Sequence, residues 1–199
     1  MIRVIFVCHG NICRSPMAEH VMKTLVSRAG IADRFEISSA AISTEEIWMG
    51  HGNPMDHRAQ RTLKSHGIPF EPGEARQITK RDFLENDLVI LMDRGNLRGL
   101  RRLLGNIVDE APAGKVRLLL DPAEVTDPWY SGDFEKAYRD IEKGCRQLLE
   151  ECAKKAIVCS GPLIPKPEGR CLWTDLCRLA SKARRNRRNS MPSSGKPGA

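Results

Sequence analysis

The chain has 199 residues, of which 41% are hydrophobic, and a formal net charge of +7. No apolar run is long enough to span a membrane and the first residues do not form a secretion signal, so we expect a cytoplasmic globular protein of one domain with an appendage. The positive charge is local, because residues 155–199 contain ten Lys or Arg and two Asp or Glu, whereas residues 1–154 contain 22 and 23.

Apolar runs alternate with amphipathic stretches along the chain. Short apolar runs predict buried strands, and apolar residues spaced three and four apart predict helices. In chain order, we expect a strand at Val4–Val7, a helix at Pro16–Ala29, a strand at Phe35–Ala40, a helix at His57–His66, strands at Leu88–Met92 and Val116–Leu120, and a long helix at Phe134–Lys155. Strands separated by helices predict an α/β fold, a single doubly wound domain with a short parallel sheet of about four strands flanked by helices.

The amino-acid composition changes after Lys155. Prolines at 162, 165 and 167 indicate a linker, so we predict that residues 1–155 form the domain. Residues 156–199 are then a basic, partly disordered extension, with a short amphipathic helix predicted at 171–183 and a basic run at 184–188.

The segment after the first predicted strand contains the candidate functional residues. It reads Cys8-His9-Gly10-Asn11-Ile12-Cys13-Arg14-Ser15-Pro16. The spacing of Cys8 and Arg14 lets the loop wrap one tetrahedral anion with its backbone N–H groups, and Arg14 can hold two phosphate oxygens at once. We expect Ser15 to cap the following helix and Pro16 to take its first position.

The positive potential of these N–H groups and of Arg14 also stabilises a thiolate, which predicts that Cys8 is a nucleophile at neutral pH. Gly10 permits a tight turn, and Asn11 tolerates a left-handed backbone. Cys13 is placed to trap an oxidised Cys8 as a reversible disulfide, or else it only packs. A buried cysteine and a surface arginine without function are the alternative, but the strand, the C-x5-R-S spacing and the proline together favour a phosphate site.

This segment, extended through Met17-Ala18-Glu19, resembles the signature of the low-molecular-weight protein tyrosine phosphatases. The resemblance covers residues 2–154 and continues through Ser38-Ser39-Ala40-Ala41, Gly52-Asn53-Pro54, Ala75-Arg76-Gln77-Ile78, Met92-Asp93-Arg94-Gly95-Asn96-Leu97 and Asp127-Pro128-Trp129-Tyr130. It implies hydrolysis of phosphotyrosine in proteins, and of aryl phosphates, through a phosphocysteine on Cys8. Arg14 would clamp the phosphate, and neither a cofactor nor a metal is expected.

The resemblance assigns the remaining roles. Asp127 becomes the general acid for the leaving phenolate and then the base for water, whereas Asp-Pro by itself is typical of a turn. The expected substrate site comprises His9, Gly10, Asn11, Ile12, Cys13, Ser15, Trp129 and Tyr130. A supporting hydrogen-bond network would join Asn11, Ser15 and Ser39. Where the family often has His, this chain has Gly73.

The segment Glu45–His51 looks longer than the usual family loop. It contains Trp48, for which two interpretations stay open: a wall of the substrate pocket or a residue of a surface excursion.

Three other functions compete with this one. An arsenate reductase of the same fold needs two further cysteines in mid-chain, but no cysteine lies between Cys13 and Cys145, and no C-x-x-C pair suggests a zinc site. A phosphoarginine phosphatase typically carries Thr where Ile12 stands. A non-catalytic phosphoprotein-binding module would not need the intact set of Cys8, Arg14 and Asp127.

The basic extension suggests partners beyond a phosphotyrosine-containing protein. Its apolar face and basic run fit peripheral contact with an anionic membrane surface. No aromatic residues interleave with the basic run, which argues against nucleic acid. A solvated extension without a partner is the plain alternative.

Overall fold

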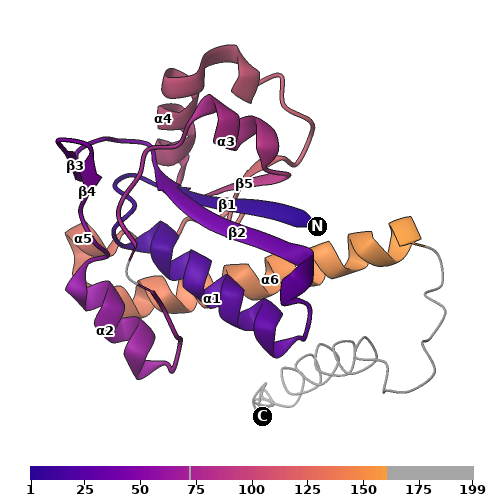
Figure 1. The fold of residues 1–199 in the computed structure, drawn as a ribbon, viewed down its shortest axis with the longest axis horizontal. Coiled ribbons are helices and arrows are strands. Elements are labelled where there is room, and N and C mark those ends of the chain that lie inside the picture. The colour runs from indigo at the N-terminus through magenta and orange to yellow at the C-terminus, as the bar shows by residue number, and fades with distance from the viewer. Residues whose placement is uncertain (72, 161–199) are drawn as a thin grey trace, which may run out of the picture. The chain divides into compact units, whose positions relative to one another are not determined.

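The computed structural model describes residues 1–71 and 73–160 (Figure 1). The predicted linker, the helix at 171–183 and the basic run at 184–188 therefore lie outside the described residues. Met1–Cys159 form one compact unit. None of the helices in the described ranges is long and apolar enough to cross a lipid bilayer.

A parallel sheet of four strands forms the centre of this unit. Its order is β2-β1-β5-β6, with β1 at Ile2–Cys8, β2 at Phe35–Ala41, β5 at Leu88–Leu91 and β6 at Val116–Leu118. All neighbouring strands run parallel, with Cys8 opposite Ala41 and Val7 opposite Leu91. The predicted α/β fold with a short parallel sheet is confirmed.

Helices cover both faces of the sheet (Figure 1). They are α1 (Arg14–Arg28), α2 (His57–Ser65), α3 (Lys80–Glu85), α4 (Arg94–Leu104), α5 (Pro128–Ser131) and α6 (Phe134–Ser160), with short 3-10 turns at Ala32–Arg34 and Gly105–Val108. Side chains alternate along β1, so Val4 and Phe6 join the core under α1 and α6, whereas Ile5 and Val7 join the core under α3 and α4. Burial on both faces is the property of a doubly wound sheet.

The start of α1 differs from the prediction. The helix begins at Arg14 rather than at Pro16, and among the described residues no side chain caps its first turn. Ser15 is not the cap, because its hydroxyl lies against Cys8 and Asn11 instead. Pro16 falls at the third helical position, where its missing N–H costs nothing because the first-turn N–H groups have no helical partner. At the other end of the unit, α6 continues past Lys155 to Ser160.

Sequence analysis did not predict three helices and a hairpin. All three helices begin at polar caps: Thr79 and Asp82 form a capping box at α3, Asp93 caps α4, and Asp127 caps α5. The hairpin joins β3 (Ile47–Trp48) to β4 (His51–Gly52). Its two turn residues, Met49 and Gly50, have φ of 50° and 84°, as a tight hairpin turn requires.

Candidate active site

The candidate site forms where neighbouring strands end. Cys8 is the last residue of β1, Asp93 follows β5, and Asp127 follows β6 and precedes α5. Parallel strands end at the same edge of a sheet, and open α/β folds bind ligands at that edge. Residues far apart in the sequence therefore meet around the loop between β1 and α1, which we call the phosphate loop (residues 8–15).

The sulfur of Cys8 is surrounded by hydrogen-bond donors. Cys8 is only 3% exposed, and its Sγ accepts the backbone N–H of Asn11 at 3.3 Å. The hydroxyl of Ser15 lies 3.0 Å from the same sulfur. Asn11 has a left-handed backbone with φ of 59°. The N–H of Asn11 is thus a donor to the sulfur, whereas the Ser15 hydroxyl also has the carbonyl of Ala40 as an acceptor at 3.4 Å.

A side-chain network holds the phosphate loop from behind. The amide nitrogen Nδ2 of Asn11 donates to Ser15 Oγ and to Ser39 Oγ, each at 2.9 Å. Its Oδ1 accepts the backbone N–H of Arg76 at 3.2 Å. The structure thus brings together the three residues of the predicted network. All three are buried, so their hydrogen bonds fix the loop.

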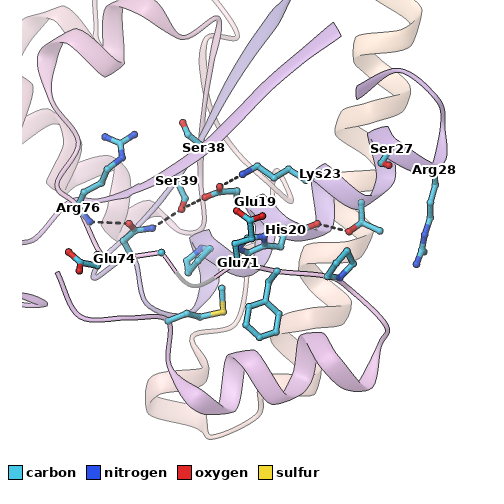
Figure 2. Close-up of a pocket in the computed structure, with 17 residues that line it drawn as sticks. Glu19, His20, Lys23, Ser27, Arg28, Ser38, Ser39, Glu71, Glu74 and Arg76 are labelled. Atoms are coloured by element: carbon cyan, nitrogen blue, oxygen red, sulfur yellow. Dashed lines mark hydrogen bonds and ion pairs between the residues drawn. The ribbon is translucent and has the colours of Figure 1, made fainter. Parts of the chain in front are cut away.

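The network extends further than the sequence analysis proposed. Ser39 Oγ donates to Glu19 Oε2 at 2.6 Å, and Lys23 Nζ donates to Glu19 Oε1 at 2.5 Å (Figure 2). Glu19 therefore anchors the outer end of the network in a chain that has Gly73 rather than His. Its carboxylate can only accept, so Ser39 must act as the donor in that contact.

The guanidinium of Arg14 lies buried between two carboxylates. Its side chain is 4% exposed; Nη1 donates to Asp93 Oδ2 at 2.6 Å, and Nη2 donates to Asp127 Oδ2. Burial by itself lowers the pKa of Arg14, but the nearby negative charges of Cys8, Asp127 and Asp93 outweigh burial and raise it. Arg14 therefore stays charged and forms a fixed cationic side of the site.

Both carboxylates are positioned by the helices that they begin. Asp93 caps α4, where its Oδ1 accepts the N–H of Asn96 at 2.6 Å. Asp127 caps α5, where its Oδ1 accepts the N–H of Trp129 at 3.0 Å. In each residue one oxygen binds the helix and the other binds Arg14. Because a backbone N–H binds one oxygen and Arg14 binds the other, the orientation of each carboxylate group is fixed.

The pocket above the phosphate loop, hereafter the phosphate pocket, has a volume of about 340 Å³. Its lining residues are Cys8, His9, Gly10, Ile12, Cys13, Arg14, Glu45, Glu46, Asp93, Gly95, Asn96, Asp127, Trp129 and Tyr130. It unites the nucleophile, cation and acid candidates in one cavity. Asn11, Ser15 and Ser39 lie behind the loop, so they support the site rather than line it.

The mouth of the phosphate pocket is aromatic and polar. Trp129 and Tyr130 are 53% and 87% exposed, so both remain available to a flat ligand. His9 Nε2 lies 2.8 Å from Glu45 Oε2 on the rim. Trp48 is absent from the described lining residues and is 79% exposed in the β3–β4 hairpin. Of its two interpretations, the structure favours the surface excursion.

Cys13 lies in the phosphate pocket but is 5% exposed. Burial raises the pKa of its thiol well above the usual range, and the charge of Asp56 raises it further. Cys13 is therefore a protonated thiol at neutral pH. The sulfur of Cys8, by contrast, accepts the backbone N–H of Asn11.

Sequence analysis missed three residues of the site. Asp93 belonged to a quoted motif, but its link to Arg14 spans 79 positions and has no local pattern. Glu19 likewise stood in the signature without a role. Arg58 was missed entirely; its guanidinium carbon lies 5.5 Å from the ring centre of Trp129 and 4.7 Å from that of Phe134. It supports the aromatic side of the mouth. No group of three or more His, Cys, Asp or Glu in the described ranges is arranged to hold a metal ion.

Comparison with known proteins gives a consistent answer. The family model described as low molecular weight phosphotyrosine protein phosphatase matches residues 3–158. The human low molecular weight phosphotyrosine protein phosphatase is 43% identical over 155 residues, which are 74% of this chain and 94% of the human one. The crystal structure of YfkJ from Bacillus subtilis is 37% identical, with a TM-score of 0.70 over 78% of this chain and 96% of that one.

An arginine phosphatase also shares the fold. The crystal structure of a Drosophila arginine phosphatase is 30% identical, with a TM-score of 0.63 over 75% of this chain and 96% of that one. The fold alone therefore does not distinguish a tyrosine phosphatase from an arginine phosphatase. The family model and the higher sequence identity to phosphotyrosine phosphatases do. On this evidence, the chain belongs to the family of low molecular weight phosphotyrosine protein phosphatases.

Proposed function

We propose that Cys8, Arg14 and Asp127 carry out the protein tyrosine phosphatase activity of this family on phosphoprotein substrates. The observation that supports this most directly is their meeting in one cavity of about 340 Å³, although Cys8 and Arg14 come from the phosphate loop after β1 and Asp127 comes from the segment after β6. The backbone N–H of Asn11 donates to the sulfur of Cys8, the guanidinium of Arg14 is buried, and the carboxylate of Asp127 is bonded to that guanidinium.

Phosphate binding begins with an exchange of anions at Arg14. In the structure, Nη2 of Arg14 donates to Asp127. A phosphate dianion offers the guanidinium two oxygens and a higher charge than a carboxylate, so it replaces Asp127 there. Asp93 keeps its bond to Nη1 and holds the guanidinium in place. Asp127 is then released next to the bridging oxygen of the substrate.

In the first chemical step, the thiolate of Cys8 attacks phosphorus. An S–P bond forms, the bond from phosphorus to the phenolic oxygen breaks, and protonated Asp127 gives its proton to the leaving phenolate. In the second step, Asp127 takes a proton from water, whose oxygen attacks phosphorus. The S–P bond breaks, inorganic phosphate leaves and the thiolate is restored. Arg14 and the loop N–H groups stabilise the negative charge throughout.

The walls of the phosphate pocket suit an aryl ester. Ile12 is 9% exposed and lines the phosphate pocket with an apolar surface, and Trp129 and Tyr130 flank the mouth. An apolar wall favours a phenyl ring over the charged guanidinium of phosphoarginine. Among the described side chains, Cys145 and Cys152 are both buried in the core on α6, which argues against their use in the rival arsenate chemistry.

We expect Cys8→Ser to lower kcat for aryl phosphate by roughly 10⁴-fold or more while inorganic phosphate still binds, since only the nucleophile is lost. Arg14→Lys should lower kcat/KM by roughly 10²–10³-fold, because the two-oxygen contact is lost. Steady-state kinetics and calorimetric phosphate binding measure both effects. The matched variant Arg117→Lys, which changes a partly buried arginine paired with Glu151, should stay active. Substantial turnover by Cys8→Ser would disprove the mechanism.

Asp127→Asn should slow the enzyme according to the leaving group. For phosphotyrosine peptides we expect a loss of roughly 10²–10⁴-fold in kcat, and a much smaller loss for an activated aryl phosphate that needs little protonation. The control is Asp133→Asn, which removes an exposed carboxylate that accepts the N–H of Lys136 but keeps an amide oxygen for that bond. Equal losses for both kinds of substrate would show that Asp127 is not the acid.

We also propose that Cys13 protects Cys8. Peroxide converts the Cys8 thiolate to a sulfenic acid, and attack by Cys13 sulfur forms the disulfide and releases water. Because burial raises the pKa of Cys13, the thiolate fraction that attacks increases with pH, so disulfide formation should become faster from neutral to alkaline pH. After peroxide and then thiol, the parent should recover activity and Cys13→Ala should not. Equal recovery would contradict the proposal.

We propose that the extension is dispensable for catalysis. All lining residues of the phosphate pocket precede α6, so a chain ending at Ser160, where α6 ends, should hydrolyse aryl phosphate like the full chain. The positive excess of residues 156–199 suits an anionic partner, and the lack of aromatic residues within the basic run favours a membrane surface over nucleic acid. Vesicle sedimentation should show salt-sensitive binding to anionic lipid by the full chain only. Binding by neither chain would exclude membrane contact, and an unfolded short chain would exclude the proposed boundary.

A further inference from the structure

Arg58, near the start of α2, contacts the segment that carries Asp127. Its guanidinium carbon lies 5.5 Å from the ring centre of Trp129 and 4.7 Å from that of Phe134, and both distances are within the range of a cation–π contact. Trp129 belongs to α5, and Phe134 is the first residue of α6. One cation from α2 therefore contacts aromatic rings on both sides of the turn between α5 and α6.

Asp56 fixes the direction of the Arg58 side chain. Its Oδ1 accepts Nε of Arg58 at 3.1 Å and its Oδ2 accepts Nη2 at 3.0 Å, which is the two-point contact of a guanidinium with a carboxylate. Asp56 also caps α2, because its Oδ1 accepts the backbone N–H of Arg58 at 2.8 Å. The backbone N–H of Asp56 donates to the carbonyl of Ile12 at 2.9 Å. The Arg58 guanidinium is thus held in a defined position relative to the phosphate loop.

The two rings under Arg58 differ in how firmly they are held. Phe134 is 6% exposed and belongs to the core, whereas Trp129 is 53% exposed. Phe134 and Asp56 therefore hold the guanidinium, and the guanidinium in turn restrains the exposed indole. The backbone N–H of Trp129 donates to Asp127 Oδ1 at 3.0 Å. A continuous series of contacts thus connects the phosphate loop to Asp127 through Asp56, Arg58 and Trp129.

This series matters most once substrate is bound. In the structure, Asp127 Oδ2 accepts from Arg14, and in the proposed mechanism phosphate replaces that contact. The chain before Asp127 stays restrained, because the Thr126 hydroxyl donates to Asp140 of α6 at 3.2 Å. The N–H that orients the carboxyl group belongs to Trp129, on the other side of Asp127. A displacement of about 1 Å at a reacting group is enough to slow catalysis strongly, so this side must be restrained as well.

We propose that Arg58 is a positioning residue for the general acid. It holds Trp129 so that the carboxyl group of Asp127 stays directed at the leaving oxygen after phosphate has taken its place on Arg14. Asp56 is the counter-ion that orients Arg58. Arg58 does not line the described phosphate pocket, so it acts through Trp129 and Asp127 rather than on the substrate. The inference rests on the proposed role of Asp127 as the acid.

Arg58→Met removes the charge and keeps a long side chain. We expect kcat for a phosphotyrosine peptide to fall roughly tenfold, the scale of one cation–π contact. An activated aryl phosphate, which needs little protonation, should lose no more than about twofold. Calorimetric binding of inorganic phosphate should hardly change, because Arg14 and the phosphate loop are intact. The control Arg61→Met changes an exposed arginine on the next turn of α2 and should have neither effect. Equal losses for the two substrates in Arg58→Met would overturn the proposal.

Asp56→Asn is the second variant, in case loss of Arg58 unfolds the chain. Asparagine keeps an amide oxygen for the cap of α2 and leaves no unpaired carboxylate, but it weakens the hold on the guanidinium. Circular dichroism checks the fold of each variant. We expect Asp56→Asn to lower kcat for the phosphotyrosine peptide more than for the activated aryl phosphate. The absence of this difference would overturn the proposal.

A double variant separates positioning of the acid from any other role. In Asp127→Asn the acid is absent, so adding Arg58→Met should cause no further loss with the phosphotyrosine peptide. A second loss of roughly tenfold would show that Arg58 acts elsewhere and would overturn its role while leaving the acid in place. Equal losses for both substrates in Asp127→Asn alone would instead remove the acid, and with it the role of Arg58.

A direct measurement on Trp129 does not depend on turnover. The indole N–H resonance of Trp129 is followed by NMR in the full chain, with Trp129→Phe for its assignment. It should shift and broaden in Arg58→Met and stay in place in Arg61→Met, because only the first variant removes the cation over the ring. An unchanged resonance in Arg58→Met would show that Arg58 does not restrain Trp129 and would overturn the proposal.

Discussion

The buried guanidinium of Arg14 is the constraint around which the site is organised. The positive charge of a side chain that is only 4% exposed must be balanced by negative charge. Two carboxylates from two other chain segments provide that charge. Asp93 and Asp127 can do so only if β5 and β6 end at the same edge of the sheet as β1, which the parallel order β1-β5-β6 ensures. The same arrangement leaves the site ready for substrate, because one of the two carboxylates can be exchanged for phosphate while the other stays.

The two carboxylates differ in a way that suits this exchange. Asp93 begins an eleven-residue helix and accepts from Asn96, whose own Oδ1 accepts the N–H of Met92 at 3.2 Å. Asp127 begins only the short helix Pro128–Ser131, and the residues after it are exposed. The firmly held carboxylate thus orients Arg14, whereas the carboxylate on the short helix has less structure behind it, as suits the role that we propose for Asp127. The two contacts of Arg14 look alike, but the helices that follow the two carboxylates differ in length.

Sequence reasoning succeeded where the information is local. The phosphate loop could be interpreted because Cys8, Arg14 and the backbone between them are contiguous, and the strands could be predicted from short apolar runs. It failed at Asp93 and Glu19, whose contacts depend on how β5 and β2 are placed beside β1. The error at Ser15 has the same origin. A serine before a proline is a good helix cap in isolation, but here the fold supplies Cys8 and Asn11 as partners for its hydroxyl.

The hydrogen-bond network also gives a reason for a serine beside Cys8, the proposed nucleophile. With Asn11 donating to its oxygen, Ser15 keeps one hydrogen and has two acceptors within reach: Cys8 Sγ at 3.0 Å and the carbonyl of Ala40 at 3.4 Å. A thiol is a poor acceptor and a thiolate a good one, so the hydroxyl makes its best bond only when the sulfur is ionised. Alanine in place of Ser15 would remove this preference and leave one hydrogen of the Asn11 amide without its acceptor. The hydrogen-bond directions fixed at Glu19 and Ser39 therefore continue to the Asn11 amide, whose other hydrogen is accepted by Ser15 beside Cys8.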